Sequence, residues 1–253
     1  MDKSESLWLV PMMVLFLLVF QQIAMRIGRF VASLFSYDRI DPYNIFAWLS
    51  VHHIVIMIIG LVAIGILAKT KKIDFGFRLG DVKVGLDHTL NFSIIVLIYV
   101  IVFRVIVIVF FNISSPDFPL NATNVVGTLG FQLLLSSTEE ILFRAFPIAL
   151  LAYSFKSSKF ITINKRIVGV SSFDVSRETV IAAILFTIAH IGWTLNPFSI
   201  NFGIHQLVLS FVFGIFYGVA YQKSKSVLYP MAMHGISNFL IVGERYLSSI
   251  FLG

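Results

Sequence analysis

The sequence contains no cysteine and few charged residues, and both shortages limit what the protein can be. Without cysteine there is no disulfide, no thiolate nucleophile and no cysteine-based metal site. Charged residues make up 13% of the 253 residues, whereas 58% are hydrophobic, and the mean hydropathy is +0.91. A chain of this length cannot bury so much apolar surface in a water-soluble core, so lipid must be its main solvent.

Seven apolar runs approach the length that a helix needs to cross a bilayer, which is about 20 residues for a hydrocarbon core of about 30 Å. Backbone groups in lipid must be hydrogen-bonded within the chain, and the apolar residues do not alternate, so the runs predict helices and not β-strands. The predicted spans are 7–25, 44–67, 91–111, 125–155, 178–193, 202–222 and 227–242. The fourth run fits either a steeply tilted helix or an interfacial helix that leads into a spanning one.

The predicted fold is therefore all-α: a polytopic membrane helix bundle of about seven transmembrane helices, or eight if the fourth run is divided. No long linker, low-complexity tract or soluble domain separates the runs, which indicates one continuous membrane domain. We expect residues 1–115 to form N-terminal scaffold helices and residues 120–245 to form the catalytic half, because most polar residues inside the runs lie in the second part.

The distribution of basic residues predicts an orientation in the membrane. The net charge is +6, but lysine and arginine lie in the connections between runs and form no stripe, so no nucleic-acid partner is expected. If seven spans alternate, thirteen basic residues lie on the side of the N-terminus and four on the opposite side. The positive-inside rule then places the N-terminus in the cytoplasm of a multi-pass cell-membrane protein. The lipid bilayer is its expected surrounding, and no oligomeric state is predicted.

The fourth run contains three charged residues, Glu139, Glu140 and Arg144. A charge near the middle of a bilayer costs at least about 2.5 kcal/mol, so each one calls for a partner or a purpose. Glu140 and Arg144 are four residues apart on one helix face, where the guanidinium can hold the carboxylate ionised. Glu139 points about 100° round the helix, away from this cation. A carboxylate without a cationic partner in an apolar site favours a proton, so Glu139 is the better general base.

Two further clusters place neutral hydrogen-bonding groups within apolar runs. Phe186 and His190 lie four residues apart in the fifth run, and His234 and Asn238 lie four residues apart in the seventh, so each pair shares one helix face. With Glu139 they form a set that can activate a water and stabilise the resulting oxyanion. Either histidine alone is more often a group that bonds one helix to another, and three clusters in one half of a short chain favour a site instead.

Other histidines are expected to have structural or interfacial roles. His52 and His53 stand side by side in the second run, so they point to different helix faces, which disfavours a joint proton relay or metal site. His205 lies at the edge of the sixth run, where an interfacial position is expected.

The three motifs, Glu-Glu-x-x-x-Arg, Phe-x-x-x-His and His-x-x-x-Asn, follow one another in separate apolar runs. In this order they resemble the CPBP family of CAAX proteases and bacteriocin-processing enzymes, also called the Abi family. The resemblance covers roughly residues 125–242. It implies an all-helical intramembrane endopeptidase that cuts a membrane-associated peptide, either prenylated or bacteriocin-like.

The resemblance also implies a role for each residue of the motifs. Glu139 would polarise the attacking water together with His190, while His234 and Asn238 would bind the oxyanion. Loss of an oxyanion donor typically costs about 2.7 to 4 kcal/mol of transition-state stabilisation. The supporting residues would be Glu140, Arg144 and Phe186.

The sequence leaves open whether a metal is needed and whether the protein is an enzyme. Members of the family have often been described as metalloproteases, and Glu139, His190 and His234 are of the types that ligate zinc. His-Glu-x-x-His is absent, however, so no cofactor is firmly predicted. A non-catalytic immunity or export protein that binds a bacteriocin peptide would carry the same motifs. An ion or proton transporter is a third interpretation. An inverted repeat would favour it, and the sequence shows no such repeat.

Overall fold

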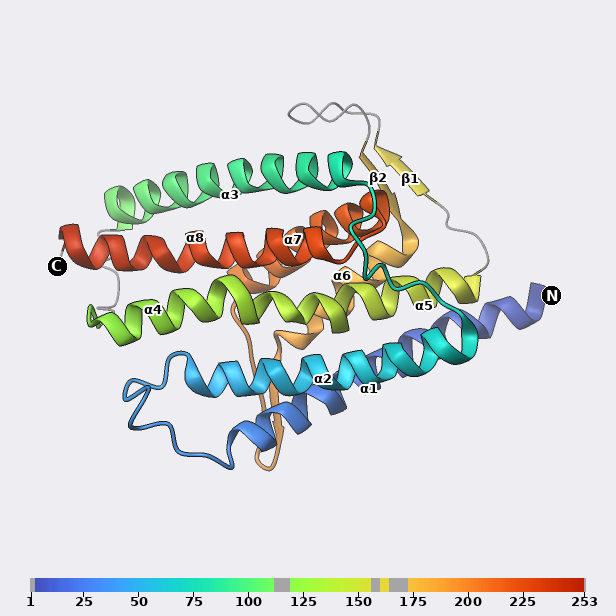
Figure 1. Cartoon of the computed structure of the whole chain (residues 1–253), viewed down its shortest axis with the longest axis horizontal. Coiled ribbons are helices and arrows are strands. Elements are labelled where there is room, and N and C mark those ends of the chain that lie inside the picture. Colours follow the sequence, from blue (N-terminus) through green and yellow to red (C-terminus); the bar gives the residue numbers. More distant parts are fainter. Residues whose placement is uncertain (1–2, 112–118, 156–159, 164–172, 253) are drawn as a thin grey trace.

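The computed structural model of the chain describes residues 3–111, 119–155, 160–163 and 173–252. Within these residues the fold is all-helical, with seven helices when the helical path over residues 122–155 is counted as one, so the predicted all-α class is confirmed. Figure 1 shows the two ends of the chain at opposite ends of the bundle. Two short β-hairpins in the connections were not predicted.

The first three helices are α1 (Lys3–Ala32), α2 (Ala47–Lys71) and α3 (Val82–Phe111). The start of α2 is held by Asp41, whose carboxylate accepts hydrogen bonds from three successive backbone N–H groups, those of residues 45, 46 and 47. These N–H groups precede the first full turn and have no partner within the helix, so the carboxylate satisfies them and suits the positive end of the helix dipole. α3 begins nine residues before the predicted third span.

The fourth run forms one helical path whose hydrogen-bond pattern changes around the two glutamates. It consists of α4 (Ala122–Gly130), a π-helix (Phe131–Leu135), a 3₁₀ turn (Ser136–Thr138), a second π-helix (Ile141–Ala145) and α5 (Phe146–Phe155). Figure 1 shows it as an unbroken ribbon. Of the two alternatives for this run, the structure therefore has the single long helix, and no eighth helix occurs within the described ranges.

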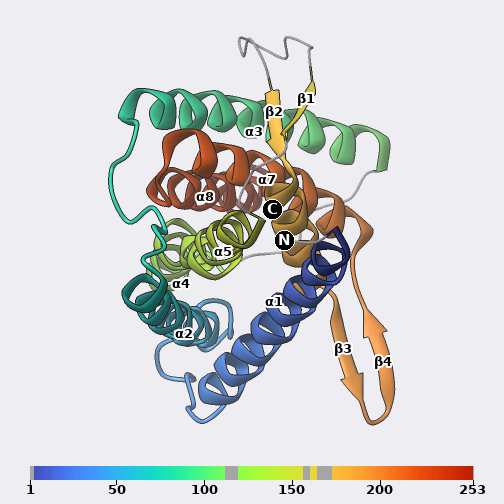
Figure 2. The ribbon, with the colours of Figure 1, turned by 90° about the vertical axis from the view of Figure 1, so that its right-hand side faces the viewer.

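The remaining elements alternate hairpins with helices. The hairpins are antiparallel, with Phe160 opposite Ser176 in the first and Gly192 opposite Asn201 in the second. Figure 2 shows β3 and β4 projecting away from the helices. The elements are β1 (Phe160–Ile163), β2 (Phe173–Ser176), α6 (Arg177–Ala189), β3 (Gly192–Leu195), β4 (Phe198–Asn201), α7 (Ile204–Ser224) and α8 (Leu228–Leu252).

Four of the helices are long and apolar enough to cross a membrane: 8–32, 47–71, 82–103 and 204–224. The fifth predicted span, 178–193, is wrong in its extent because α6 ends at Ala189 and a strand begins at Gly192. Its 13 residues rise about 20 Å, which is less than the hydrocarbon core of about 30 Å. The end of α6 can therefore lie inside the bundle.

The helical path over residues 122–155, termed the broken helix because its hydrogen-bond pattern changes along it, lies in the middle of the bundle. In both views α4 and α5 lie between α2 on one side and α8 on the other, with α3 beyond α8, and α1 lies beside α2 (Figures 1 and 2). One buried apolar cluster joins α1, α2 and α6 to the second π-helix, and includes Ile56, Phe143 and Phe186. Another joins α3, α7 and α8 through Phe92 and Tyr217. Polar groups on the broken helix are thus enclosed by apolar side chains on both sides.

Glycines allow the close helix contacts around this region. A Cβ at Gly218 would lie 2.7 Å from the Thr179 side chain, so α7 approaches α6 where no side chain intervenes. At Gly214 a Cβ would lie 3.2 Å from the Arg144 guanidinium. Small residues at such contacts let helix backbones approach within a membrane.

Gly235 on α8 packs directly against the first π-helix, and we expect Gly235→Ala to destabilise the fold. A Cβ there would clash with the carbonyl oxygen of Leu133, which as a backbone atom cannot rotate away. The expected loss of unfolding free energy is about 1 to 3 kcal/mol. Gly243→Ala is the matched control on the same helix, because its nearest neighbour would be Leu129 Cδ2 at 3.9 Å. Thermal unfolding in detergent measures both variants, and equal melting temperatures would contradict the close packing.

Candidate active site

One cavity of about 530 Å³ lies between α2, the broken helix, α6, α7 and α8. The broken helix, α6 and α8 each contribute polar side chains at its wall, and they are the elements that carry the three sequence motifs. The polar residues that line it are His53, Gln132, Ser136, Glu139, His190, His205, Gln206, Ser210, Tyr217, His234, Asn238 and Arg245. All four residues predicted as catalytic are therefore brought to one cavity.

The two π-helices lie on either side of Glu139 and Glu140. A π-turn replaces the i to i−4 hydrogen bond by an i to i−5 bond, as in the Phe146 N–H bond to the carbonyl of Ile141. The neighbouring carbonyl of Leu142 accepts a hydrogen bond from the Gln21 side chain of α1 at 3.1 Å. Such π-bulges occur frequently at functional sites because they change the direction of side chains along a helix.

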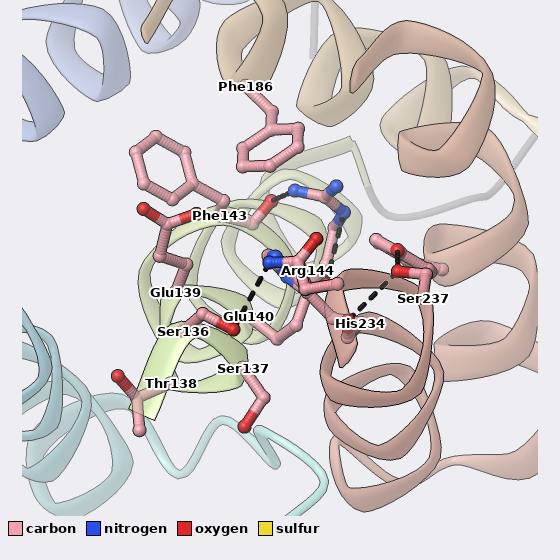
Figure 3. A network of polar contacts seen from close by, with 12 residues as sticks. Ser136, Ser137, Thr138, Glu139, Glu140, Phe143, Arg144, Phe186, His234 and Ser237 are labelled. Carbon is pink, nitrogen blue, oxygen red and sulfur yellow. Dashed lines mark hydrogen bonds and ion pairs between the residues drawn. The ribbon is translucent and has the colours of Figure 1, made fainter. Parts of the chain in front are cut away.

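Glu140 belongs to a buried charge network between the broken helix and α8. Its Oε1 accepts a hydrogen bond from Nδ1 of His234 at 2.8 Å, and its Oε2 lies 3.3 Å from Nε of Arg144. Neither Glu140 nor Arg144 has any exposed side-chain area. Figure 3 shows Glu140 turned toward His234, with Glu139 on the other side of the helix. The predicted pairing of Glu140 with Arg144 is present, and the bond to His234 links the first motif to the third.

Aromatic rings complete the surroundings of Arg144. Its guanidinium carbon lies 4.2 Å from the centre of the Phe186 ring and 5.5 Å from that of Tyr217. Phe186 also meets His190 edge-on with ring centres 4.6 Å apart, and Tyr217 stacks on His234 at 5.3 Å. A cation held over ring faces keeps part of its stabilisation after it leaves water. Phe186 therefore contacts Arg144 of the first motif as well as His190 of its own motif.

Glu139 faces the opposite direction and meets a histidine from another helix. Its Oε1 lies 3.0 Å from Nε2 of His53 on α2. The interpretation of Glu139 as a carboxylate without a basic partner is therefore wrong. His53, for which a structural or interfacial role was expected, lies at the wall of the cavity. His52 conforms to that expectation, because its ring stacks on Trp48 and does not line the cavity.

The remaining donors are oriented by neighbours within hydrogen-bonding distance. Nδ1 of His190 lies 2.8 Å from the carbonyl oxygen of Phe186, and Nδ2 of Asn238 donates to Oγ of Ser136 at 3.2 Å. Ser136 in turn donates to the carbonyl of Gln132. His190 is the residue that follows the short α6, so the end of this helix brings it to the cavity.

The family comparison agrees with this arrangement. Residues 121–240 match the family described as type II CAAX prenyl endopeptidase Rce1-like. This segment, just under half of the chain, belongs to the CPBP/CAAX protease family. All three motifs lie within the matched segment, whereas His53 lies outside it. No curated protein and no solved structure shows a significant match to the chain. Membership of this family supports a CAAX protease-type membrane endopeptidase and a membrane-associated peptide substrate.

Zinc was left open for Glu139, His190 and His234. Among the residues that the structure describes, no three histidine, aspartate or glutamate side chains are close enough together to hold a metal ion. Nδ1 of His234 already bonds to Glu140, and Nε2 of His53 already faces Glu139. The described side chains therefore do not form a zinc site in this arrangement.

Among the residues of the cavity wall that were not predicted, His53, Ser136 and Tyr217 contact residues of the motifs. Ser136 had a usable signal, because it precedes Glu139 by three residues in an apolar run and a polar group at that spacing shares the helix face. His53 and Tyr217 belong to helices without a motif, and only the packing of α2 and α7 brings them to the site. His205, expected at the interface, lines the cavity and bonds to Tyr99 on α3 at 2.6 Å.

Proposed function

We propose that the protein is an intramembrane endopeptidase that hydrolyses a peptide bond of a membrane-associated peptide with a water activated by Glu139. The observation that carries the proposal is the convergence of Glu139, His190, His234 and Asn238 on one cavity inside an apolar bundle. A carboxylate, two imidazoles and an amide are the groups that acid–base hydrolysis and oxyanion stabilisation need. The family match supports the same reaction class.

Glu139 and His190 are suited to activate the water. Nδ1 of His190 bonds to a carbonyl oxygen, which can only accept, so Nδ1 carries the hydrogen and Nε2 of the neutral ring holds a lone pair. Nε2 can then accept one hydrogen of the water while Glu139 removes the other. The hydroxide attacks the carbonyl carbon of the scissile bond. As the C–N bond breaks, the leaving amine takes the proton from Glu139.

His234 and Asn238 are suited to stabilise the oxyanion. The Asn238 amide has two N–H groups, and the bond to Ser136 uses one of them, which leaves the other for the substrate oxygen. Nδ1 of His234 donates to Glu140, so Nε2 can donate to the oxyanion when the ring is an imidazolium.

The bundle is proposed to cross the membrane with seven helical passes, of which α6 is the short one, and with the N-terminus in the cytoplasm. Residues 1–115 would form the scaffold and 120–245 the catalytic half, with His53 as a contribution of the scaffold to the site. The substrate would be a prenylated or bacteriocin-like peptide that enters the cavity from the lipid. These assignments follow from the charge distribution and from the family resemblance.

The proposal is tested by cleavage of membrane peptides with purified protein in detergent, with products identified by mass spectrometry. Wild type, chelator-treated wild type and Glu139→Gln are compared on prenylated and unprenylated peptides of equal sequence. Cleavage by wild type and by the chelated protein, but not by the variant, supports a metal-independent glutamate peptidase. Loss on chelation would make the protein a metalloenzyme. Binding of the peptides without any cleavage would favour the non-catalytic immunity or export protein.

The oxyanion role of Asn238 predicts a kinetic effect with little effect on binding. We expect Asn238→Ala to lower kcat by about 100-fold to 1000-fold, because the amide donates a hydrogen bond that strengthens only as the oxyanion forms. KM should change little. Asn201→Ala, on the exposed strand β4, is the control and should match wild type. A variant with unchanged kcat would assign Asn238 to packing against Ser136 alone.

A further inference from the structure

His53 touches the proposed general base although it lies outside the segment that the family comparison matches. Nε2 of His53 is 3.0 Å from Oε1 of Glu139, and the two side chains are 9% and 16% exposed. The histidine comes from the second turn of α2 and lines the same cavity as the four predicted catalytic residues. None of the roles assigned above includes this contact.

The hydrogen bonds of His53 determine where its protons lie. Nδ1 is 2.8 Å from the carbonyl oxygen of Leu49, one turn earlier on α2. A carbonyl oxygen only accepts, so Nδ1 must carry a hydrogen. In a neutral imidazole the other nitrogen, Nε2, then has a lone pair and no hydrogen. A lone pair directed at an ionised carboxylate oxygen 3.0 Å away is repulsive, so this combination does not fit the contact.

The contact therefore requires one proton between Nε2 and Oε1. Either an imidazolium donates to an ionised Glu139, or a neutral carboxylic acid donates to a neutral His53. The two forms have the same total charge and differ only in the position of the proton. Charge-assisted hydrogen bonds between ionised partners are roughly twice as strong as neutral ones. Only the ionised form leaves Glu139 able to take a proton from water.

We propose that His53 is a positioning residue that holds this proton, keeps Glu139 ionised and occupies Oε1, so that Oε2 is left for the attacking water. The inference rests on the proposed peptidase function. When Oε2 takes a proton from water, His53 keeps its own proton and continues to donate to Oε1. When the leaving amine takes the proton from Oε2, the pair returns to its starting state, and His53 gains and loses nothing in the cycle.

The charged and titratable groups around the pair come from several helices, and His205 and Tyr217 of α7 and Arg245 of α8 line the same cavity. His52 on α2 meets His53 edge-on at 5.3 Å, and Arg29 on α1 acts on His52 from the other side. His190 on α6 and His234 on α8 face Glu139 across the cavity. Glu140 and Arg144 carry opposite charges and form an ion pair with each other. Among the residues that the structure describes, Glu139 is the carboxylate that contacts His53.

The kinetic test compares His53→Gln with His52→Gln. Glutamine at position 53 keeps an N–H donor for Glu139 but removes the charge, so a more alkaline solution is needed to ionise the carboxylate. We expect the acid limb of the kcat–pH profile to move up by about 1 to 3 pH units, with KM nearly unchanged. His52→Gln removes a neighbouring histidine that does not touch Glu139, and its profile should match wild type. Coincident profiles for His53→Gln and wild type would overturn the inference.

A measurement without substrate separates this inference from the peptidase proposal. Nitrogen NMR of protein labelled in its histidines, with the His53 signals assigned from their loss in His53→Gln, reports whether one or both ring nitrogens are protonated. Near neutral pH we expect both to be protonated in wild type and only Nδ1 in Glu139→Gln. A neutral His53 ring in wild type would overturn the inference even if peptides are cleaved. An imidazolium that depends on Glu139 would support it even if no peptide is cleaved.

Discussion

Glu139→Gln is expected to lower kcat by about 100-fold to 10,000-fold and to leave the fold intact. The range is that of a lost general base, because the amide cannot take a proton from water. The side chain keeps its size, and its N–H can donate to the Nε2 lone pair of a neutral His53, so the contact with α2 survives. Steady-state cleavage measures kcat, and thermal unfolding in detergent verifies the fold.

Two comparisons make this prediction decisive. Glu139→Asp keeps the carboxylate but withdraws it by one methylene group, so it should retain more activity than Glu139→Gln. Gln132→Ala changes another polar residue of the same cavity wall that has no acid–base function. If Glu139→Gln cleaves at the wild-type rate, Glu139 is not the base and water activation must be assigned to another group.

The helical class of the fold could be predicted because lipid leaves the backbone few alternatives. Continuous apolar runs without alternation predict helices wherever internal hydrogen bonds are obligatory. The extent of the individual helices was less predictable. α6 ends at Ala189, whereas the predicted span continues to Trp193. The chain leaves the helix there to form the β3–β4 hairpin, in which Gly192 pairs with Asn201. Hydropathy alone does not distinguish the residues of this hairpin from those of a helix.

The π-helices of the broken helix could not be predicted from its sequence. The residues from 131 to 145 are compatible with a regular α-helix, and the change of hydrogen-bond pattern depends on neighbours such as Gln21, which donates to the carbonyl of Leu142 from α1. Regular helix geometry nevertheless placed Glu140 and Arg144 correctly on one face. It did not predict that Glu140 also bonds to His234.

A polar residue of the site could be predicted when two conditions held: its side chain is costly to place in the membrane, and it is spaced from another polar or aromatic residue so that both share one helix face. Glu139, His190, His234 and Asn238 satisfy both conditions, and all four line the cavity. His53 satisfied only the first, since its partner is 86 positions away and belongs to another helix. Contacts between distant segments of the chain depend on helix packing, which a single sequence does not specify.

The charge network behind the cavity leads to the second large effect, a loss of stability in Glu140→Gln. The substitution leaves the Arg144 guanidinium fully buried without its carboxylate, and removal of one partner of a buried ion pair costs about 3 to 5 kcal/mol. The Phe186 and Tyr217 rings lessen this cost but carry no counter-charge. Chemical unfolding in detergent should therefore show a markedly lower midpoint for this variant.

Two further variants separate the charge effect from the loss of packing. Glu178→Gln is the matched control: Glu178 is equally buried, but its neighbour Arg177 lies 3.8 Å away and is 38% exposed, so water can solvate the cation that remains. We expect a smaller loss there. Glu140→Gln combined with Arg144→Met removes both charges and should regain most of the stability, because no unpaired ion is left inside. The double variant should still be inactive, since His234 has lost the carboxylate that orients its ring. If the double variant is no more stable than Glu140→Gln, the loss comes from the broken bond to His234 and not from the uncompensated charge of Arg144.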